Sequence, residues 1–291
     1  MENILCIDIG GTSIKYAIYN DQGQEVRKFP AKDTNAKERL IIETIKELTD
    51  EVVAEYSLSG VAISSAGVID SEKGEVIYSG YTIPNYMGTN FKQFFKEQYA
   101  LDCEIENDVN AACLAEYYAG AARNAQSVVC LTIGTGVGGA LMIDGHLVHG
   151  KGNTAGEIGY MLIGDRYFQD VSSTTFLVEY INQIQDETHY QNGMEIFEGY
   201  KNGDIHCEDA ILTLINNLSV GLVNIMYLIN PEVIALGGGI MEQKELLQPL
   251  IEEAIQNKLI SEMFNKTEIK FAENKNSAGL IGAFHHYIHQ R

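Results

Sequence analysis

The chain has 291 residues, of which 45% are hydrophobic and 21% are charged, so it can bury a sizeable core and does not have a disordered composition. Its net charge of −20 and its pI of about 4.6 disfavour binding to nucleic acid or to anionic membranes. Five cysteines without a C-x-x-C spacing indicate free thiols, mostly in the core, and no basic start precedes a long apolar run. We therefore expect a cytoplasmic protein.

A β-hairpin is the first predicted element. The apolar run from Ile4 is followed by the glycine turn Asp8-Ile9-Gly10-Gly11-Thr12 and by a second apolar run, Ile14 to Tyr19, which ends in the turn N-D-Q-G. Glycines in such a turn let backbone amides approach a phosphate, Thr12 offers a hydroxyl, and Asp8 could hold Mg²⁺ through water. A tight turn with a capping aspartate explains the same residues equally well, so the turn alone leaves both interpretations open.

Alternating helices and strands follow. We predict helices over 35–56, 91–99 and 109–122, and strands over 61–63 and 103–105. The second strand leads into Glu106-Asn107-Asp108 at the start of a helix. Asn107 or Asp108 could cap that helix, and Asp108 could instead accept a proton in phosphoryl transfer to a hydroxyl. Because helix caps are far commoner than catalytic bases, the local pattern favours a cap.

A second β-hairpin repeats the first. Residues 128–134 line up with residues 4–10, and the glycine turn Gly134–Gly139 is followed by an apolar run, Ala140 to Ile143, and a D-G turn. The glycines satisfy G-x-G-x-x-G and Glu157 lies 18 residues after Gly139, as in a dinucleotide-binding fingerprint. That fingerprint needs a helix after the turn, whereas this turn opens into a strand, so we reject it. We infer a duplicated hairpin with a phosphate-sized glycine turn in each half.

The rest of the chain is mostly helical. Predicted helices are 173–184, 195–200, 209–228, 244–259 and 278–289, and predicted strands are 233–236 and 268–271. Hairpins followed by alternating helices and strands indicate an α/β fold. We expect two lobes, residues 1–120 with 278–291 and residues 121–277.

Several residues of this second half have both a functional and a structural interpretation. Gly237–Gly239 could accept a purine or a ribose, but the pattern alone favours a plain strand-to-helix turn. Glu157, between glycines, could accept hydrogen bonds from sugar hydroxyls or could simply face solvent, and Glu179 fits a solvated helix face. No cysteine or acid at metal spacing accompanies the histidines of the last helix, so we expect surface positions for His285, His286 and His289.

Taken together, the motifs resemble those of the ROK sugar kinases, which belong to the actin-like or ribonuclease-H-like ATPase superfamily. The resemblance covers nearly the whole chain, and the motifs occur in family order. They are D-I-G-G-T at 8–12, S-A-G-V-I-D at 65–70, I-P-N-Y at 83–86, E-N-D-V-N-A-A at 106–112, T-I-G-T-G-V-G-G at 132–139, A-G-E-I-G-Y-M at 155–161, N-P-E-V-I-A-L-G-G-G-I at 230–240 and S-A-G-L-I-G-A at 277–283.

The resemblance implies a two-lobed ATPase fold whose cleft binds ATP, Mg²⁺ and a sugar, and it implies a homodimer. It also implies that Asp108 is the catalytic base, which reverses the cap interpretation, and that the acceptor is a hexose-type hydroxyl. The residues implied to bind ATP or its phosphates are Asp8, Gly10, Gly11, Thr12, Lys15, Gly134, Thr135, Gly136 and Gly238. Those implied to bind the sugar are Gly67, Asn107, Asp108, Glu157, Tyr160 and Glu179.

Two departures from the family pattern bear on metal and substrate. Many members have G-E-I-G-H followed by cysteines that bind zinc, but here Tyr160 replaces the histidine and Leu162 to Phe176 contains no cysteine, so we expect no structural zinc. Glu179 aligns poorly with the acid that follows the last of those cysteines. Zinc-lacking members with this pattern resemble β-glucoside kinases, and Tyr160 would offer a flat apolar surface to an aglycone. The expected acceptor is the 6-hydroxyl of a β-glucoside or of glucose.

Other functions stay open as alternatives. One is a kinase of the same family for N-acetylmannosamine or a fructose-type hexose, and another is a non-catalytic sugar-sensing protein. A repressor of the family would carry an N-terminal helix-turn-helix, but the first predicted strand starts at Ile4 and the net charge opposes DNA binding. The intact Asp108 and both glycine turns argue against a catalytically silent sugar-binding protein.

Overall fold

The computed structural model describes residues 2–34, 40–80, 83–186 and 188–291. Its contacts divide the chain into two compact units. The first unit comprises the residues up to Arg123, the short segment His149–Ala155, and Asn274–Arg291. The second unit comprises Asn124–Val148 and Gly156–Glu273. The chain therefore passes from one unit to the other more than once, and His149–Ala155 is a brief return to the first.

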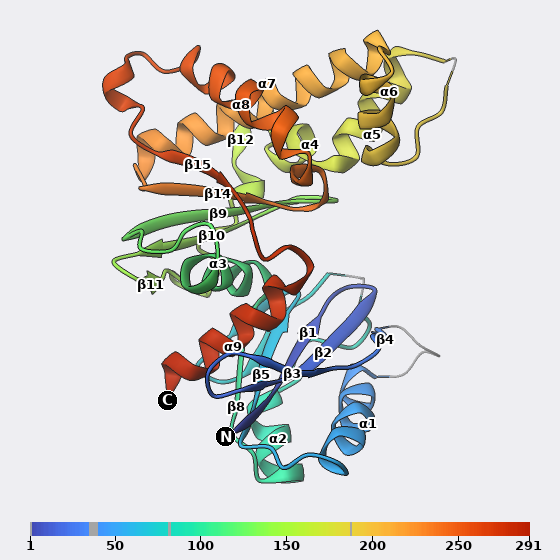
Figure 1. The fold of residues 1–291 in the computed structure, drawn as a ribbon, viewed down its shortest axis with the longest axis vertical. Coiled ribbons are helices and arrows are strands. Elements are labelled where there is room, and N and C mark those ends of the chain that lie inside the picture. Colours follow the sequence, from blue (N-terminus) through green and yellow to red (C-terminus); the bar gives the residue numbers. More distant parts are fainter. Residues whose placement is uncertain (1, 35–39, 81–82, 187) are drawn as a thin grey trace. The chain divides into compact units, whose positions relative to one another are not determined.

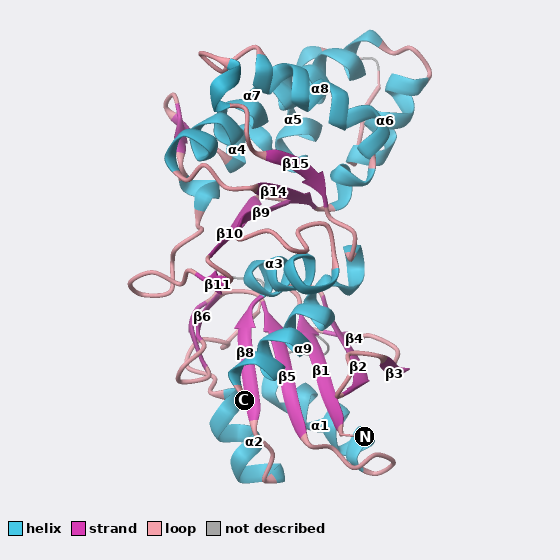
Figure 2. Ribbon diagram, turned by 60° about the vertical axis from the view of Figure 1, so that its left-hand side comes forward, coloured by secondary structure: helices cyan, strands magenta, loops and turns pink. Residues whose placement is uncertain are grey.

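The first unit is built on a mixed sheet with the order β3-β2-β1-β5-β8, and β4 pairs with β2 (Figures 1 and 2). Strands β1, β2 and β3 are antiparallel, whereas β1, β5 and β8 are parallel. The strands are β1 (Asn3–Ile9), β2 (Ser13–Asn20), β3 (Glu25–Lys28), β4 (Lys32–Asp33), β5 (Gly60–Ser65) and β8 (Cys103–Asn107). A separate short hairpin consists of β6 (Val68–Asp70) and β7 (Glu75–Tyr78).

Different helices cover the two faces of this sheet. Successive residues of a strand point to opposite faces. Leu5 and Ile7 accordingly pack in one buried cluster with α1 (Ile41–Val53) and α2 (Phe91–Tyr99), whereas Ile4 and Cys6 pack in another with α9 (Ala278–Gln290). Helix α3 (Asp108–Ala119) lies against α9. The C-terminal helix is thus part of the core of the unit that begins with β1.

The second unit repeats this sheet. Its order is β11-β10-β9-β14-β15, with an antiparallel hairpin followed by parallel strands, as in the first unit. The strands are β9 (Ser127–Ile133), β10 (Val137–Ile143), β11 (His146–Leu147), β14 (Val233–Gly237) and β15 (Glu268–Phe271). The duplicated hairpin predicted from the sequence is therefore confirmed, and so is the α/β class.

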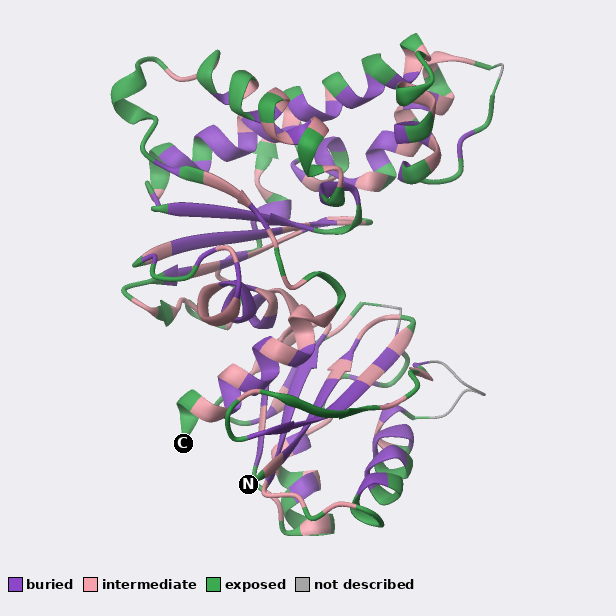
Figure 3. Ribbon diagram, in the orientation of Figure 1, coloured by how far each residue is buried: buried purple, intermediate pink, exposed green. Residues whose placement is uncertain are grey.

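Helices cover the second sheet. They are α4 (Gln169–Ser172), α5 (Thr174–Ile184), α6 (Gly193–Lys201), α7 (Ile205–Leu228) and α8 (Lys244–Gln256). Within the described ranges, α7 is the one helix long and apolar enough to cross a membrane, but 56% of its most apolar window is buried inside the unit. Figure 3 shows that burial along the helix, which is typical of a core helix.

Most predicted elements are confirmed, with shifted ends. The helix predicted over 35–56 spans Ile41–Val53, and its first five positions, 35–39, lie outside the described residues. The strand predicted over 103–105 continues to Asn107, and the next helix begins at Asp108. The sequence analysis missed β6 and β7, as well as the hairpin of β12 (Leu162–Ile163) and β13 (Arg166–Tyr167). All cysteines are free and buried, as expected.

A buried carboxylate on α3 joins two stretches of the first unit, the one that ends at Arg123 and the one that begins at Asn274. Glu116 is 1% exposed and accepts hydrogen bonds from the backbone amides of Ala121, at 2.8 Å, and Asn274, at 2.9 Å. The side-chain amide of Asn274 donates to the carbonyl of Ala115 at 3.1 Å. The end of the first stretch and the start of the last stretch of this unit therefore meet at the C-terminal part of α3.

Close contact between α3 and α9 depends on Gly282. A Cβ atom at this position would overlap the backbone carbonyl of Ala111, and backbone cannot move aside as a flexible side chain can. We predict that Gly282→Ala lowers the free energy of unfolding by about 1–3 kcal/mol, because overpacking forces the helices apart. Urea unfolding followed by circular dichroism measures this, with Gly80→Ala as the control, since a Cβ there has nothing within 4 Å. Equal midpoints for both variants would contradict the prediction.

Candidate active site

Polar side chains of the first unit gather where its parallel strands end. Asp8 of β1 lies opposite Ser64 of β5, and Ser64 lies opposite Glu106 of β8. The hydroxyl of Ser64 donates a hydrogen bond to Asp8 Oδ1 at 2.9 Å. Parallel strands end at the same edge of a sheet, which is where α/β proteins place their sites. The register thus brings Asp8 and the segment Glu106–Asp108 to one edge.

Asn107, not Asp108, caps α3. Its side-chain oxygen accepts hydrogen bonds from the backbone amides of Val109, at 2.9 Å, and Asn110, at 3.1 Å. Asp108 is the first helical residue, and its Oδ1 accepts from the Asn107 side-chain amide at 3.0 Å and from the Val109 amide at 2.9 Å. Its side chain is only partly covered. Asp108 is therefore held in place by its neighbours and still reaches solvent.

The electrostatics of this edge raise the pKa of Asp108 to about 6, because burial disfavours the charged form and the charge of Asp8 adds to the effect. Burial also raises the pKa of Asp8, although the Ser64 hydroxyl and the Lys15 ammonium, 3.7 Å from Asp8 Oδ2, oppose this. A carboxyl group with a pKa near 6 is ionised at neutral pH and accepts a proton more readily than an ordinary aspartate.

The glycine turn after β1 is fixed by the segment that follows β4. The amide of Gly10 donates to the carbonyl of Ser13 at 3.0 Å. Thr34 donates through its hydroxyl to the carbonyl of Gly10 at 2.7 Å and through its amide to the carbonyl of Thr12 at 3.1 Å. Thr12 is exposed and Gly11 is half-buried. The turn is thus held by Thr34, while Thr12 within it stays accessible.

Gly67 and Tyr86 complete this edge. Gly67 has a φ of 104°, which favours glycine, and its carbonyl accepts from the Asn107 side-chain amide at 2.9 Å. The hydroxyl of Tyr86 is 2.6 Å from that of Ser65, and the tyrosine is 1% exposed. Burial raises the pKa of Tyr86, and the charge of Asp108 adds to the rise. The structure therefore brings together all the predicted site residues of the first unit.

In the second unit, the residues predicted to bind ATP lie together at the glycine turn after β9. The amide of Gly134 donates to the carbonyl of Gly136 at 2.9 Å. The start of α5 holds the turn, because the Thr174 amide donates to the carbonyl of Gly134 and the Thr175 hydroxyl to that of Thr135, both at 2.8 Å. Gly238, with a φ of 105°, lies against the backbone of Ile133, one residue before the turn. Gly134, Thr135, Gly136 and Gly238 are therefore neighbours.

Glu157 lies on a segment that packs directly on β10. Cβ atoms at Gly139 or Gly156 would overlap the facing segment, so these glycines permit the close approach. The Glu157 carboxyl is exposed, yet the surrounding protein still desolvates it enough to raise its pKa. Tyr160 follows in the same turn and is 58% exposed. Glu179 is exposed on α5, where the sequence analysis placed it on a solvated helix face.

The sequence analysis missed a buried carboxylate and two histidines. Glu106 is fully buried and lies 2.7 Å from His149 Nε2. His286, which we expected at the surface, is 4% exposed, and its Nδ1 is 3.8 Å from Glu106 Oε2. The surface prediction for His286 was wrong because its side of α9 faces β8. The motif E-N-D contained the signal, since it includes Glu106, but nothing in the local sequence points to His149 or His286.

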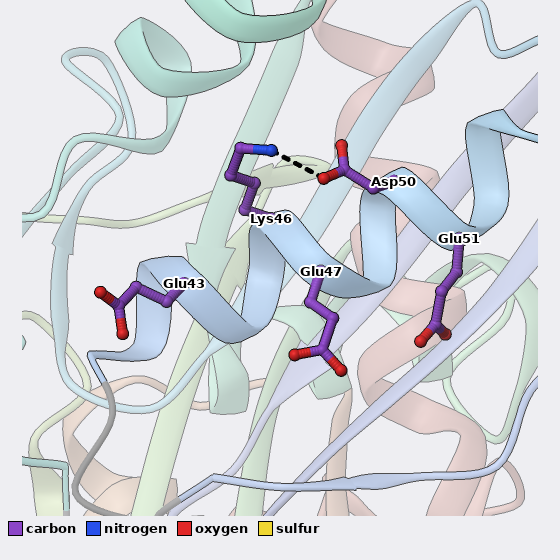
Figure 4. Close-up of a pocket in the computed structure, with 5 residues that line it drawn as sticks. All are labelled: Glu43, Lys46, Glu47, Asp50 and Glu51. Atoms are coloured by element: carbon purple, nitrogen blue, oxygen red, sulfur yellow. Dashed lines mark hydrogen bonds and ion pairs between the residues drawn. The ribbon is translucent and has the colours of Figure 1, made fainter.

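Outside these edges the described residues form no metal-binding cluster, and the hollow on α1 is not a basic pocket. Within the described ranges, no three His, Cys, Asp or Glu side chains lie together in a way that could hold a metal ion. A hollow on α1 is lined by Glu43, Lys46, Glu47, Asp50 and Glu51, and in Figure 4 Lys46 pairs with Asp50. Lys32 pairs with Glu47 and Glu51. Four of the five residues that line the hollow are acidic, which does not suit a nucleotide phosphate.

Comparison with known proteins identifies relatives along the whole chain. The profile of the ROK family matches residues 4–290. An uncharacterized protein of Clostridium perfringens is 43% identical over 97% of this chain and 96% of its own length. A beta-glucoside kinase of Listeria innocua is 30% identical over 99% of this chain and 98% of its own length.

Solved structures of ROK family proteins resemble this chain along nearly its whole length. A ROK family protein from Streptococcus pneumoniae, in complex with sucrose, has a TM-score of 0.88 and 28% identity, and the match covers 99% of this chain and 98% of the other. A ROK family glucokinase from Streptomyces griseus, in complex with glucose and AMPPNP, has a TM-score of 0.79 and 24% identity, with 97% of each chain covered. The chain therefore has the actin-like ATPase fold expected from its sequence.

The electrostatic coupling of Asp8 and Asp108 yields a direct prediction. In Asp8→Asn the like charge disappears, while the amide oxygen can still accept from Ser64, so the pKa of Asp108 should fall from about 6 toward its ordinary value. Carbon-13 NMR titration of the aspartate carboxyl groups measures the pKa. Asp70→Asn is the control, because the Asp70 carboxyl is held by Lys73. An unchanged Asp108 pKa in Asp8→Asn would mean that burial alone raises it.

Proposed function

The chain belongs to the ROK family and is a sugar kinase of that family, and we propose that it transfers the γ-phosphoryl group of ATP to the 6-hydroxyl of a β-glucoside or of glucose. The observation that carries the proposal is the Asp108 carboxyl. It belongs to the first residue of α3, directly after the parallel strand β8, is held by Asn107, is partly accessible, and has a pKa raised to about 6. A hydroxyl nucleophile needs a base with these properties.

In the proposed reaction, the hydroxyl oxygen of the acceptor attacks the γ-phosphorus. The bond between the γ-phosphorus and the bridging oxygen breaks, ADP leaves with the bonding electron pair, and the hydroxyl proton passes to Asp108. Mg²⁺, when bound with ATP, would supply charge neutralisation at the phosphates. The donor set fits that ion, because Asp8 is an incompletely covered carboxylate and Mg²⁺ prefers oxygen ligands, often through water.

We assign phosphate binding to the two glycine turns. The first turn is Gly10, Gly11 and Thr12. It follows Asp8, and the Lys15 ammonium, 3.7 Å from Asp8 Oδ2, would attract a phosphate. The second, Gly134, Thr135 and Gly136, is held by the start of α5. Gly238 lies next to the second turn, which supports the proposal that it faces the adenosine. Backbone amides of glycine turns bind phosphates without a positive surface, which suits a chain with a net charge of −20.

For the sugar we propose Asn107, Gly67 and Glu157 as ligands, together with Tyr160 as the surface for an aglycone. Tyr160 is 58% exposed and makes an edge-to-face contact with Tyr167, so an aromatic face stays open for an apolar ring. The relatives called beta-glucoside kinases support this acceptor. Glu179 is retained as a candidate ligand only through its family position. We further propose a cytoplasmic homodimer, and the alternative acceptors are N-acetylmannosamine and fructose-type hexoses.

The role of Asp108 is tested by Asp108→Asn. We expect kcat to fall by roughly 10²-fold or more, because the amide cannot accept the proton, while the fold is retained. In the parent enzyme, kcat/KM for the sugar should fall with decreasing pH through about 6, since protonated Asp108 cannot act as a base. A coupled assay of ADP release measures both quantities.

Two observations would remove Asp108 from this role. One is an Asp108→Asn variant with unchanged turnover, and the other is an acidic limb that persists with the same midpoint in the residual activity of the variant. Circular dichroism and thermal melting of the variant serve as the control for folding.

The aglycone surface is tested with cellobiose, arbutin and glucose as acceptors. We expect Tyr160→Ala to raise KM for cellobiose and arbutin by about 5- to 10-fold and KM for glucose by less than about 2-fold, since only the glucosides have a second ring to stack. Tyr160→Phe keeps the ring and should keep the preference. Equal changes for all three acceptors in Tyr160→Ala would show that Tyr160 does not contact the aglycone.

A further inference from the structure

Glu106 is a buried carboxylate whose two oxygens are shared among several segments of the first unit. Its Oε1 accepts hydrogen bonds from the backbone amide of Asn107, at 2.8 Å, and from the side-chain amide of Asn110, at 2.9 Å. Its Oε2 accepts from the hydroxyl of Ser71 at 3.0 Å and lies 2.7 Å from His149 Nε2. Glu106 thus bonds directly to Asn107, the residue that holds Asp108.

His149 is the first residue of the segment that returns briefly to the first unit. The segment closes on itself, because the amide of Ala155 donates to the carbonyl of His149 at 3.0 Å. Glu157 follows two positions after Ala155 in the chain. The contact between Glu106 and His149 therefore connects the end of β8, next to Asp108, to the segment His149–Ala155, which precedes Glu157 in the chain.

The charges around this contact favour an ion pair. Burial alone would raise the pKa of Glu106, but the hydrogen bond from His149, the charges of His286 and His149, and the Asn110 amide outweigh it and lower the pKa. Glu106 in turn raises the pKa of His149. From α9, His286 faces both Glu106 and Glu104, and burial lowers its pKa, while Lys92 of α2 pairs with Glu104 at 2.7 Å.

We propose that Glu106 and His149 are positioning residues of the phosphoryl transfer, and this proposal rests on the proposed role of Asp108 as the base. Glu106 cannot touch a substrate, because it is fully buried. Through Asn107 it fixes the start of α3 and therefore the carboxyl of Asp108. Through His149 it fixes the loop before Glu157. Loss of either contact leaves Asp108 and Glu157 in the chain but no longer fixes their positions. Small displacements of reacting groups cost about 10- to 100-fold in rate.

The test uses His149, whose side chain is 31% exposed and tolerates replacement better than Glu106. In His149→Ala we expect kcat/KM for the sugar to fall by about 10- to 100-fold, while KM for ATP changes by less than about 2-fold. His149→Gln places an amide donor near the position of Nε2 and should restore activity to within about 3-fold of the parent. His146→Ala is the matched control, because His146 is an exposed histidine on β11 that bonds to Asp144.

A double variant separates positioning from a general loss of stability. If Glu106 and His149 act through each other, adding His149→Ala to Glu106→Gln should lower kcat/KM by less than about 3-fold more, whereas independent roles would multiply the two losses. If Glu106→Gln does not fold, the two His149 variants decide alone.

Three results would overturn the proposal. They are a His149→Ala enzyme within about 2-fold of the parent, a loss that affects sugar and ATP equally, and a failure of His149→Gln to restore activity. Each is distinct from failure of the proposed function, which would show instead as full activity in Asp108→Asn.

Discussion

Two carboxyl groups, two positions apart, lie where strand β8 passes into helix α3, and their acidities must differ. Glu106 is surrounded by donors from Asn107, Asn110, Ser71 and His149, and these hold it ionised although it is fully buried. Asp108 accepts fewer bonds and experiences the charge of Asp8, so its proton is held more strongly. Pairs of titratable groups whose pKa values are pushed apart are typical of acid–base sites. The fold of the first unit provides this separation through strand register.

The ion pair of Glu106 and His149 also ties stability to pH. The lowered pKa of Glu106 contributes stability above its ordinary value of 4.5, and this is lost as the pH falls through the lowered value. The raised pKa of His149 contributes below its ordinary value of 6.5 and is lost as the pH rises through the raised value. Both contributions to stability are therefore complete only between pH 4.5 and pH 6.5. Asp108, with a pKa of about 6, is fully ionised only at higher pH. Above the raised pKa of His149 the charge of the pair is lost, but the hydrogen bond remains, because a neutral imidazole can still donate it.

Local patterns in the sequence were sufficient to predict the hairpins, the glycine turns and the strand-to-helix junction next to Asp108. Each of these features depends on residues that are near one another in the chain. The duplication was visible in the alignment of residues 4–10 with 128–134, and the matching sheet orders explain it. Contacts between distant residues were not predictable in this way. His149 is 43 residues from Glu106, and His286 reaches it from the last helix, so its burial follows from the packing of α9 rather than from its neighbours in sequence. The hairpin of β12 and β13 was missed because each strand has only two residues.

Helix α3 carries functional and structural contacts at opposite ends. Asp108 stands at its first position, and Glu116, about two turns later, accepts hydrogen bonds from the backbone amides of Ala121 and Asn274. A short helix is stiff along its axis, so the positions of Asp108 and Glu116 on α3 are coupled. The Asp108 carboxyl and the contacts of Glu116 therefore belong to one stiff helix, so the orientation of Asp108 depends on what Glu116 holds.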